Sequence, residues 1–519
     1  MTNSERSVTH KINGIKVACV AGSGRASGTE DKETCLDPCV VVIMGATGDL
    51  TARKLMPALF SLYGTGMLPE PFAIVGCGRT VQNSDQFRNR MSDALQASGK
   101  ADSNKLAGFI SRLHYQTVAY GKRSSYVELA EFLGKLNLET GAQGNGIFYL
   151  ALPPKLYLPV ARMIGKNGLA SEGEQGNGWA RLVVEKPFGS DLASALALDK
   201  GIHEHFRERQ VFRIDHYLAK ETIQNVLMFR FANSIFEPVW NRRYIESVRI
   251  TASESLGVEH RAGYYEQAGV LRDMFQNHMM QLLALTAMEP PSTFEADRVR
   301  DEKIKVYRAL RPFQTESMAS HLVLGQYDKG VVDGKAVPAY REEPGVSGHS
   351  MTPTYAMMKL YLDNWRWQGV PFYLISGKRL KQKRTDITIQ FKRVPHSMFR
   401  KVIGDRITAN QLKLSSYPEE MISLTFQTKT PGAKVDLRPV TMDFHYHQKT
   451  DGVVLEAYEK VLLDCILGDQ MLFWRQDGVE ACWAFLTPIL SMCETCDDRP
   501  AKLHFYQSGT WGPKAGRRT

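Results

Sequence analysis

The sequence lacks any apolar run near the roughly 18 residues that a membrane-spanning helix requires. It has only eight cysteines in 519 residues, which excludes a disulfide scaffold and predicts reduced thiols. Its N-terminal stretch has neither the charged start nor the apolar core of a signal peptide. These absences lead us to expect a cytoplasmic protein without a membrane partner.

Clustered metal ligands and blocks of charge are scarce as well. Cys493 and Cys496 form a C-x-x-C pair, but no second close pair accompanies them, and a structural zinc site needs about four ligands. We therefore expect no metal. The formal net charge of +10 attracts anions, from phosphorylated metabolites to nucleic acid. Because the basic residues are mostly dispersed, and the cluster Lys378–Arg384 lies between predicted strands, we expect no nucleic-acid partner.

The length of the chain predicts two domains behind a mobile N-terminal extension, residues 1–37. Over 38–212, short apolar runs alternate with helical patterns, which predicts an α/β Rossmann-like coenzyme domain. Over 213–519, segments such as 385–391 and 422–426 alternate apolar and polar residues. We expect an α+β domain with a large antiparallel sheet, which binds substrate and could bury a face against a second subunit.

A glycine-rich turn follows the first apolar run, Val40–Met44, and a helical pattern follows the turn. The turn, Gly45–Leu50, departs from the common G-x-G-x-x-G pattern, but a strand before and a helix after it favour dinucleotide binding. Pro57 should kink the helix. Arg79 follows the second strand, where NAD-binding folds usually carry a carboxylate, so NADP is favoured. Lys54 either adds charge here or is a solvated helix residue.

A second glycine-rich stretch, Val17–Gly24, is a weaker candidate for dinucleotide binding. No apolar helical face follows it, and Pro38 would end any helix that began there. We interpret it as part of the extension. The extension also carries Cys19 and Cys35, for which thiol-based regulation and a disordered tail are both open.

Two polar clusters follow predicted strands. Lys186 ends a buried strand at the sheet edge where doubly wound folds bind ligands, although a lysine there is more often a surface residue. The segment Arg213–Glu221 brings together Asp215, His216, Tyr217 and Lys220, which suit a phosphate monoester. The alternative is a polar strand-to-helix junction.

His278 shares one face of a predicted amphipathic helix, 271–287, with apolar residues, and a histidine so placed is usually a core residue. The nearest acid, Asp273, is five residues earlier and so about 140° away at 3.6 residues per turn. If His278 is catalytic, Asp215 is therefore the better candidate for its carboxylate.

The segment RIDHYLAKE, Arg213–Glu221, resembles the active-site signature of glucose-6-phosphate dehydrogenases. GATGDL from 45, ALPP from 151, EKPFG from 185, RDMFQNH from 272 and the lysines after Gly377 resemble other landmarks of that family in order, over about residues 38–512. The resemblance implies oxidation of glucose 6-phosphate to 6-phosphogluconolactone with reduction of NADP. It also implies a homodimer or homotetramer.

The resemblance implies roles for individual residues. His278 would be the general base, Asp215 would orient it, and Lys186 would lie near the reacting end. The substrate-binding set would be Lys186, His216, Tyr217, Lys220, Glu254, Asp273, Lys378 and Lys383. The cofactor-binding set would be Gly45, Ala46, Thr47, Gly48, Asp49, Leu50, Lys54, Arg79, Tyr157 and Lys186.

Some members bind a second, structural NADP through arginines and tyrosines, and this chain resembles them only in part: it has Ile375, Thr388, Ser415 and Ser423 but keeps Arg384 and Asp443. We therefore expect one NADP per subunit. Two other functions are open: another two-domain NADP-dependent sugar oxidoreductase, and a catalytically inactive sensor of NADPH or sugar phosphate. A sensor would predict loss of His278 or Asp215, and both are present.

Overall fold

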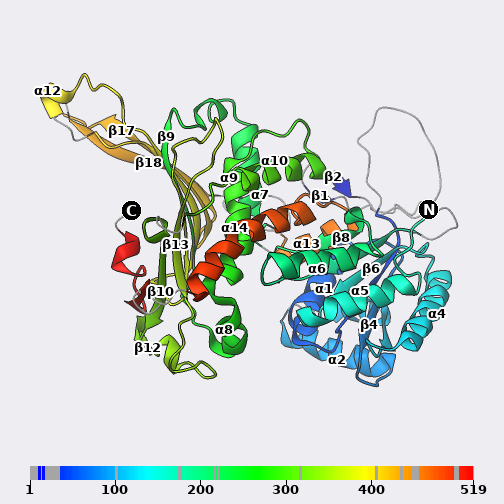
Figure 1. Cartoon of the computed structure of the whole chain (residues 1–519). Coiled ribbons are helices and arrows are strands. Elements are labelled where there is room, and N and C mark those ends of the chain that lie inside the picture. Colours follow the sequence, from blue (N-terminus) through cyan, green and yellow to red (C-terminus); the bar gives the residue numbers. More distant parts are fainter. Residues whose placement is uncertain are drawn as a thin grey trace, which may run out of the picture. The chain divides into compact units, whose positions relative to one another are not determined.

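The structure is a computed structural model that describes residues 10–12, 15–17, 36–99, 103–173, 178–215, 217–218, 221–314, 318–403, 407–432, 436–445, 455–495 and 502–517. The chain divides into two compact units (Figure 1). Unit 1 comprises Met1–Gly189, Ala193–Ala219 and Asp451–Gln476. Unit 2 comprises Ser190–Leu192, Lys220–Thr450 and Asp477–Thr519. The functional division at residue 212 remains a prediction, because packing does not reveal what each part binds.

Unit 1 contains a six-stranded parallel sheet in the order β5-β4-β3-β6-β7-β8. Its strands are β3 (Cys39–Met44), β4 (Phe72–Gly78), β5 (Leu113–Thr117), β6 (Gly146–Leu150), β7 (Ala180–Val184) and β8 (Val211–Arg213). Every residue of β3 and β4 is buried, as continuous apolar runs in a doubly wound sheet require. The expected Rossmann-like fold is confirmed: strand order reverses between β3 and β6, where such folds bind ligands.

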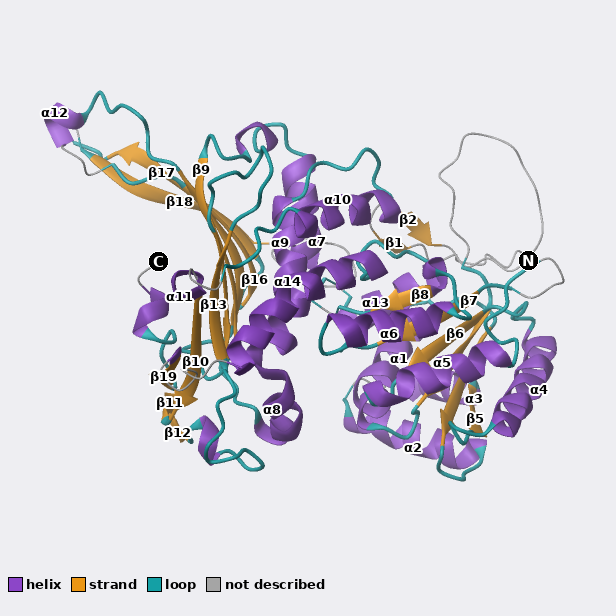
Figure 2. Ribbon diagram, viewed as in Figure 1, coloured by secondary structure: helices purple, strands orange, loops and turns teal. Residues whose placement is uncertain are grey.

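Helices flank this sheet (Figure 2). They are the π-helical η1 (Thr51–Leu55), α1 (Met56–Gly64), α2 (Ser84–Ala97), α3 (Ser103–Ser111), α4 (Arg123–Thr140), η2 (Pro154–Leu156), α5 (Tyr157–Lys166), α6 (Leu192–His203), η3 (Glu208–Gln210) and α13 (Ala457–Leu467). α13 arrives from far along the sequence, yet it packs on α1 and shares an apolar core with β3. Pro57 lies in the first turn of α1, directly after η1, where the absent N–H interrupts regular α-helical bonding.

Unit 2 contains a nine-stranded sheet in the order β18-β17-β16-β15-β9-β14-β13-β10-β19. Its strands are β9 (Ile245–Ser253), β10 (Leu322–Asp328), β13 (Tyr355–Leu360), β14 (Phe372–Gly377), β15 (Arg384–Phe391), β16 (Gln411–Tyr417), β17 (Met421–Lys429), β18 (Leu437–His445) and β19 (Leu503–Gln507). Among the described strands of this sheet, only the pairs β9–β14 and β10–β19 are parallel, which confirms the largely antiparallel sheet. A separate pair joins β11 (Gly330–Val332) to β12 (Lys335–Val337).

The helices of unit 2 include α9, α10 and α14 on one side of the sheet (Figure 2). In chain order they are α7 (Glu221–Phe231), η4 (Glu237–Val239), η5 (Glu259–Arg261), α8 (Ala262–Val270), η6 (Leu271–Met279), α9 (Met280–Ala287), α10 (Ala296–Arg308), α11 (Met318–His321), η8 (Tyr340–Glu342), α12 (Arg400–Ile403), α14 (Gln476–Thr495) and η10 (Lys514–Arg517).

The prediction of an amphipathic α-helix over residues 271–287 is wrong in two respects. Its first half, η6, is π-helical, and only α9 is α-helical. Among its residues only Arg272 is not buried, so there is no exposed polar face. In a π-helix the i→i+5 hydrogen bonds bring residues five apart near one another, so the 140° separation calculated for Asp273 and His278 does not hold.

Part of the N-terminal extension is described as a short antiparallel pair, β1 (His10–Ile12) with β2 (Ile15–Val17). Cys19, Cys35 and the glycines after Val17 lie outside the described residues, and so does Cys496. Within the described ranges, no helix is both long enough and apolar enough to cross a membrane.

Candidate functional site

The glycine turn lies at the reversal point of the parallel sheet. Gly45 has φ +95, and a Cβ there would lie 2.2 Å from the carbonyl oxygen of Ala151, which follows β6. The N–H groups of Gly45 and Ala46 donate to Cys77 O at 2.8 and 3.0 Å, and that of Gly48 donates to Gly45 O at 2.9 Å. Only glycine fits this close approach without strain, so the backbone itself forms the floor of the expected cofactor site.

The residues after the turn present a helix N-terminus and exposed charges. Asp49 pairs with Arg53 at 2.9 Å, and both side chains are exposed. The Lys54 side chain is also exposed and forms no ion pair among the described residues. Thr47, Gly48 and Leu50 are partly exposed. A pyrophosphate fits such a helix start, because backbone N–H groups and the helix dipole favour an anion there.

Arg79 is exposed directly after β4, as expected for a residue that contacts the 2′-phosphate of NADP. Among the described residues it has no carboxylate partner, and its charge acts on the phenol of Tyr120. Burial raises the pKa of Tyr120 to about 12, and Arg79 opposes this rise. A second arginine that sequence reasoning missed, Arg90 of α2, donates to Thr47 O at 2.6 Å. The donor set therefore fits NADP.

A buried acid lies at the end of β7. Glu185 Oε1 accepts hydrogen bonds from Tyr149 at 2.6 Å and from Tyr458 at 3.2 Å. Burial raises the pKa of Glu185, these phenols and the Lys186 ammonium lower it, and Asp215 raises it. Lys186, Glu185 and Asp215 are thus electrostatically coupled within unit 1. Tyr458 comes from α13, and no local sequence signal indicated its role.

Asp215 is 3% exposed and begins a tight turn after β8. Its Oδ1 accepts from the N–H of Tyr217 at 3.0 Å, and its carbonyl accepts from Leu218 at 3.1 Å. Tyr217 is buried. His216 and Lys220 lie outside the described residues, so their phosphate-binding role remains a prediction.

Tyr157 is buried as the first residue of α5. Its phenol acts electrostatically on Tyr458, whose own pKa is raised first by burial and then by Glu185. Tyr157 therefore belongs to the group around Glu185 rather than to the glycine turn, and its contact with nicotinamide remains a prediction.

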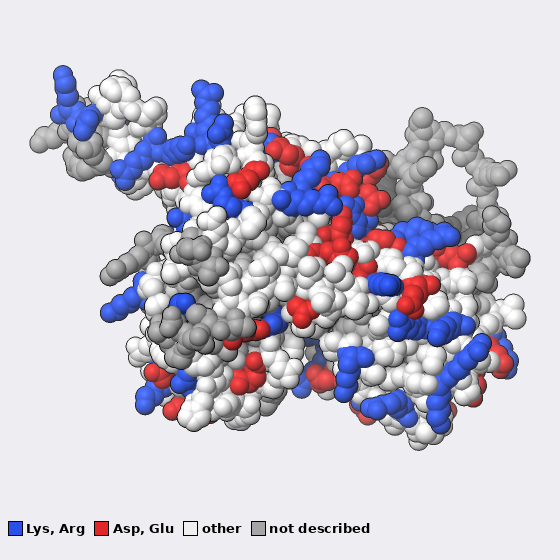
Figure 3. Space-filling model, in the orientation of Figure 1, with Lys and Arg blue, Asp and Glu red and all other residues white. Residues whose placement is uncertain are grey.

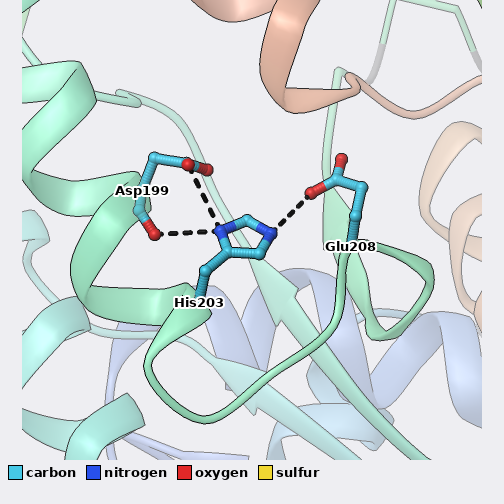
Figure 4. A group of neighbouring side chains, drawn as sticks. All are labelled: Asp199, His203 and Glu208. Atoms are coloured by element: carbon cyan, nitrogen blue, oxygen red, sulfur yellow. Dashed lines mark hydrogen bonds and ion pairs between the residues drawn. The ribbon is translucent and has the colours of Figure 1, made fainter.

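Asp199, His203 and Glu208 form a cluster whose oxygen and nitrogen atoms could hold a metal ion (Figure 4). The His203 ring contacts Asp199 through Nδ1 and Glu208 through Nε2, at 3.2 and 3.1 Å. Arg213 already donates to the same acids, to Asp199 at 2.7 Å and to Glu208 at 2.8 Å. Since a guanidinium neutralises these oxygens, we interpret the group as an ion-pair cluster that fixes the end of β8.

In unit 2 the structure brings together three of the predicted substrate-binding residues. Glu254 and Lys378 directly follow the parallel strands β9 and β14, where Ser253 pairs with Gly377. The Lys378 ammonium contacts Glu254 and lies 4.0 Å from Asp273 Oδ2. Lys378 and Asp273 are both buried.

Neighbouring groups leave binding capacity at this cluster. The Arg261 guanidinium lies 3.5 Å from the Asp273 carboxylate, and the Tyr264 phenol forms a hydrogen bond with the same carboxylate. Burial raises the pKa of Tyr264 to about 12, and the charge of Asp273 adds to this rise. The phenol oxygen of Tyr265 is buried without a hydrogen-bond partner among the described residues. The Lys378 ammonium lies 5.0 Å from the centre of its ring. Acids, an ammonium and an unpaired phenol suit the hydroxyl groups of a sugar.

His278 is 1% exposed on η6, the same helix as Asp273. Since the angular argument against Asp273 fails, the pairing of His278 with Asp215 now depends on the family resemblance alone. Lys383 is not part of the buried cluster: it is exposed, with its ammonium 4.4 Å from the ring centre of Tyr417.

Surface charge is mixed on the face shown in Figure 3, where Lys and Arg are interspersed with Asp and Glu. On this face the basic residues are therefore not gathered into one block.

Comparison with known proteins gives matches over almost the whole chain. The family model "Glucose-6-phosphate dehydrogenase, NAD binding domain" matches residues 42–225, and "Glucose-6-phosphate dehydrogenase, C-terminal domain" matches 227–519. The glucose-6-phosphate 1-dehydrogenase of Aggregatibacter actinomycetemcomitans is 45% identical, covering 92% of this chain and 94% of that protein. The enzyme of the same name from Bacillus subtilis is 42% identical, covering 92% and 95%.

Solved structures agree. A glucose-6-phosphate dehydrogenase in complex with glucose 6-phosphate superimposes with a TM-score of 0.85 at 35% identity, covering 93% of this chain and 96% of that one. Glucose-6-phosphate 1-dehydrogenase from Mycobacterium avium gives 0.78 at 32% identity, covering 93% and 97%. By sequence and by fold, this chain belongs to the glucose-6-phosphate dehydrogenase family.

Proposed function

We propose that this chain oxidises glucose 6-phosphate to 6-phosphogluconolactone and reduces NADP, the first step of the oxidative pentose phosphate pathway. The supporting observation is that this member of the family has side chains suited to the cofactor in unit 1 and side chains suited to the sugar in unit 2. Unit 1 has a glycine turn beside an arginine without an acid partner, and unit 2 has a buried acid–lysine cluster whose Asp273 lies on the same helix as the buried His278.

Chemically, the C1 hydroxyl of the sugar loses its proton to His278 while C1 loses a hydride, and the C–O bond becomes the lactone carbonyl. NADP, when bound, supplies the acceptor for that hydride, so no metal is required. An imidazole suits the base because its pKa lies near neutrality. Asp215 orients the imidazole and stabilises its protonated form, and Lys186 holds the reacting end of the sugar.

Substrate contacts divide by chemistry. His216, Tyr217 and Lys220 bind the 6-phosphate, since an ammonium and directional donors match a phosphate monoester. Glu254, Asp273 and Lys378 bind sugar hydroxyls, and the exposed Lys383 contributes only long-range charge. The cofactor lies on residues 45–50, with Lys54 and Arg79 near its phosphates and Tyr157 toward its nicotinamide.

The base assignment is tested by replacing His278 with Asn and following NADPH absorbance at 340 nm. We expect kcat to fall by about 10²–10⁴-fold, with binding of glucose 6-phosphate retained. His396, an exposed histidine of the same unit, provides the matched control His396→Asn. A near-normal kcat in His278→Asn would refute the assignment, and no NADPH formation by the unaltered chain would favour an inactive sensor instead.

The orienting acid is tested by comparing Asp215→Asn with Asp273→Asn. Loss of the orienting acid should lower kcat and shift the acidic limb of the pH–rate profile. Loss of a substrate-binding acid should mainly raise the KM for glucose 6-phosphate. If Asp273→Asn changes the pH profile and Asp215→Asn does not, the pairing belongs to Asp273.

We also propose self-association through the edge of the large sheet. β18 is an edge strand with outward apolar side chains, Met442 at 61% and Phe444 at 53% exposure. Edge strands of this kind are covered in stable proteins, which favours a homodimer or homotetramer. Sedimentation equilibrium of the chain and of Phe444→Glu tests this: a monomer in both would exclude the proposal.

A cytoplasmic location completes the proposal. Cys39, Cys77, Cys465 and Cys482 are free and buried, as expected for a protein that works in a reducing compartment.

A further inference from the structure

Arg79 and Arg90 of unit 1 have no acid partner among the described residues, although several neighbouring arginines do. Arg53 pairs with Asp49 at 2.9 Å, Arg88 with Asp85 at 2.9 Å and Arg112 with Glu70 at 3.1 Å. Arg79 and Arg90 have no such partner, and both side chains are exposed. Unneutralised guanidinium groups beside a glycine turn mark an anion site.

The start of α2 is held close to β4, and this places Arg90 near the glycine turn. Asn83 caps α2 through reciprocal hydrogen bonds with Gln86, both 2.9 Å. Phe87 packs directly on β4: a Cβ at Gly76 would lie 2.6 Å from its ring, so glycine is what allows α2 to approach the strand. Arg90 follows Phe87 by three residues and therefore lies on nearly the same face of α2.

Two tyrosines near the end of β4, Tyr115 and Tyr120, interact electrostatically with the two arginines. Tyr115 donates to Thr80 O at 2.8 Å, which holds the turn that begins with Arg79. Burial raises the pKa of Tyr115, and the charge of Arg90 opposes this rise. Arg79 acts in the same way on Tyr120, and the two phenols interact with each other. Both cations therefore lie within electrostatic range of one small group of side chains.

One Arg90 donor, Nη2, is bonded to Thr47 O at 2.6 Å, and its remaining guanidinium N–H groups have no acceptor among the described residues. We propose that these donors bind the 2′-phosphate of NADP, so that Arg90 joins Arg79 in determining the preference for NADP over NAD. This rests on the proposed cofactor site. A phosphate dianion beside two guanidinium groups gains paired charge-assisted bonds that a ribose hydroxyl does not.

The competing role is purely structural: Arg90 could only fasten the glycine turn through Thr47. That role predicts equal losses for NADP and NAD, because both place the same pyrophosphate on the turn. The two roles therefore separate in cofactor selectivity rather than in overall activity.

The test measures equilibrium binding of NADP, NAD and adenosine 2′-monophosphate by calorimetric titration of the intact chain, without substrate turnover. We expect Arg90→Ala to weaken NADP and adenosine 2′-monophosphate by about 10–100-fold and NAD by less than about 3-fold. Asn89→Ala, an exposed neighbour on α2, controls for general effects on the helix. Arg90→Lys should retain part of the selectivity, since it keeps the charge but loses the fork.

Equal weakening of NADP and NAD, or no change in either, would overturn the proposal for Arg90. Arg79→Ala measured in parallel separates this from failure of the cofactor site. If Arg79→Ala is selective for NADP and Arg90→Ala is not, only Arg90 is excluded. If neither is selective, the 2′-phosphate binds elsewhere and the proposed cofactor site is wrong.

Discussion

The ion-pair cluster at the end of β8 makes a testable prediction about stability. Hydrogen bonds that the Asp199 and Glu208 carboxylates accept from the His203 ring raise its pKa to about 10 (Figure 4). With Arg213, a protonated His203 balances the two acids, whereas a neutral ring leaves one negative charge in excess. Replacing His203 with Gln keeps a polar side chain but removes the proton.

The size of the effect follows from the difference between the folded-state pKa and the unperturbed value. A pKa of about 10 against 6.5 gives an upper bound of about 5 kcal/mol. The His203 and Glu208 side chains are 24% and 27% exposed, so water screens the pair and we expect about 2–3 kcal/mol. Because the folded pKa is the higher one, this stability is complete below about pH 6.5 and is lost as pH rises through about 10.

Differential scanning calorimetry from pH 6 to 9.5 is the appropriate assay, because two compact units need not unfold together. We expect the transition of unit 1 to fall by several degrees at pH 6 in His203→Gln, with the difference shrinking steadily toward pH 9.5. His396→Gln, at an exposed position, should show no such trend. A difference that is constant over this range would mean that the proton on His203 does not hold the cluster together.

Two further substitutions test the two halves of the site. Gly45→Ala places a Cβ 2.2 Å from Ala151 O at φ +95, so we expect a loss of at least about 1–2 kcal/mol and weaker NADP binding, measured by denaturation and titration. Gly134→Ala in α4, where nothing lies within 4 Å of the new Cβ, should instead be neutral or stabilising. Lys378→Gln removes the cation between Glu254 and Asp273, so the KM for glucose 6-phosphate should rise about 10-fold or more while NADP binding is unchanged. Lys381→Gln, exposed in the same loop, is its control, and equal effects of the two would disprove a local role for Lys378.

The parallel sheet was predictable because its signal is local. Val40–Met44 is a continuous apolar run followed by glycine, and such a run fits a strand buried on both faces. The position of Arg79 was predictable for the same reason, since it depends only on where β4 ends. In contrast, no local pattern indicates which core an apolar helix joins. α13 therefore could not be assigned to unit 1, and the contact of its Tyr458 with Glu185 could not be foreseen.

The geometry of residues 271–279 was also beyond local reasoning. Apolar residues at positions 271, 274, 275 and 282, with His278 on the same face, are typical of an amphipathic α-helix. Burial on nearly all sides removes the need for a polar face, and π-helical bonding changes which side chains are neighbours. The identity of His278 as a candidate did not depend on this geometry, but the argument about its acid partner did.

The position of the buried cluster in unit 2 follows from strand direction. In an antiparallel pair, one strand ends where its neighbour begins, and a short hairpin often joins the two there. In a parallel pair, both strands end on the same side of the sheet, so the segments that follow them start next to each other. β9 and β14 form one of only two parallel pairs among the described strands of this sheet, and Ser253 is in register with Gly377. Glu254 and Lys378 are therefore brought side by side where these two strands end. In unit 1, Gly45 and Arg79 likewise follow the neighbouring parallel strands β3 and β4, where Met44 is in register with Cys77. The same physical rule thus positions predicted ligand-binding residues in both units, although one sheet is parallel and the other is largely antiparallel.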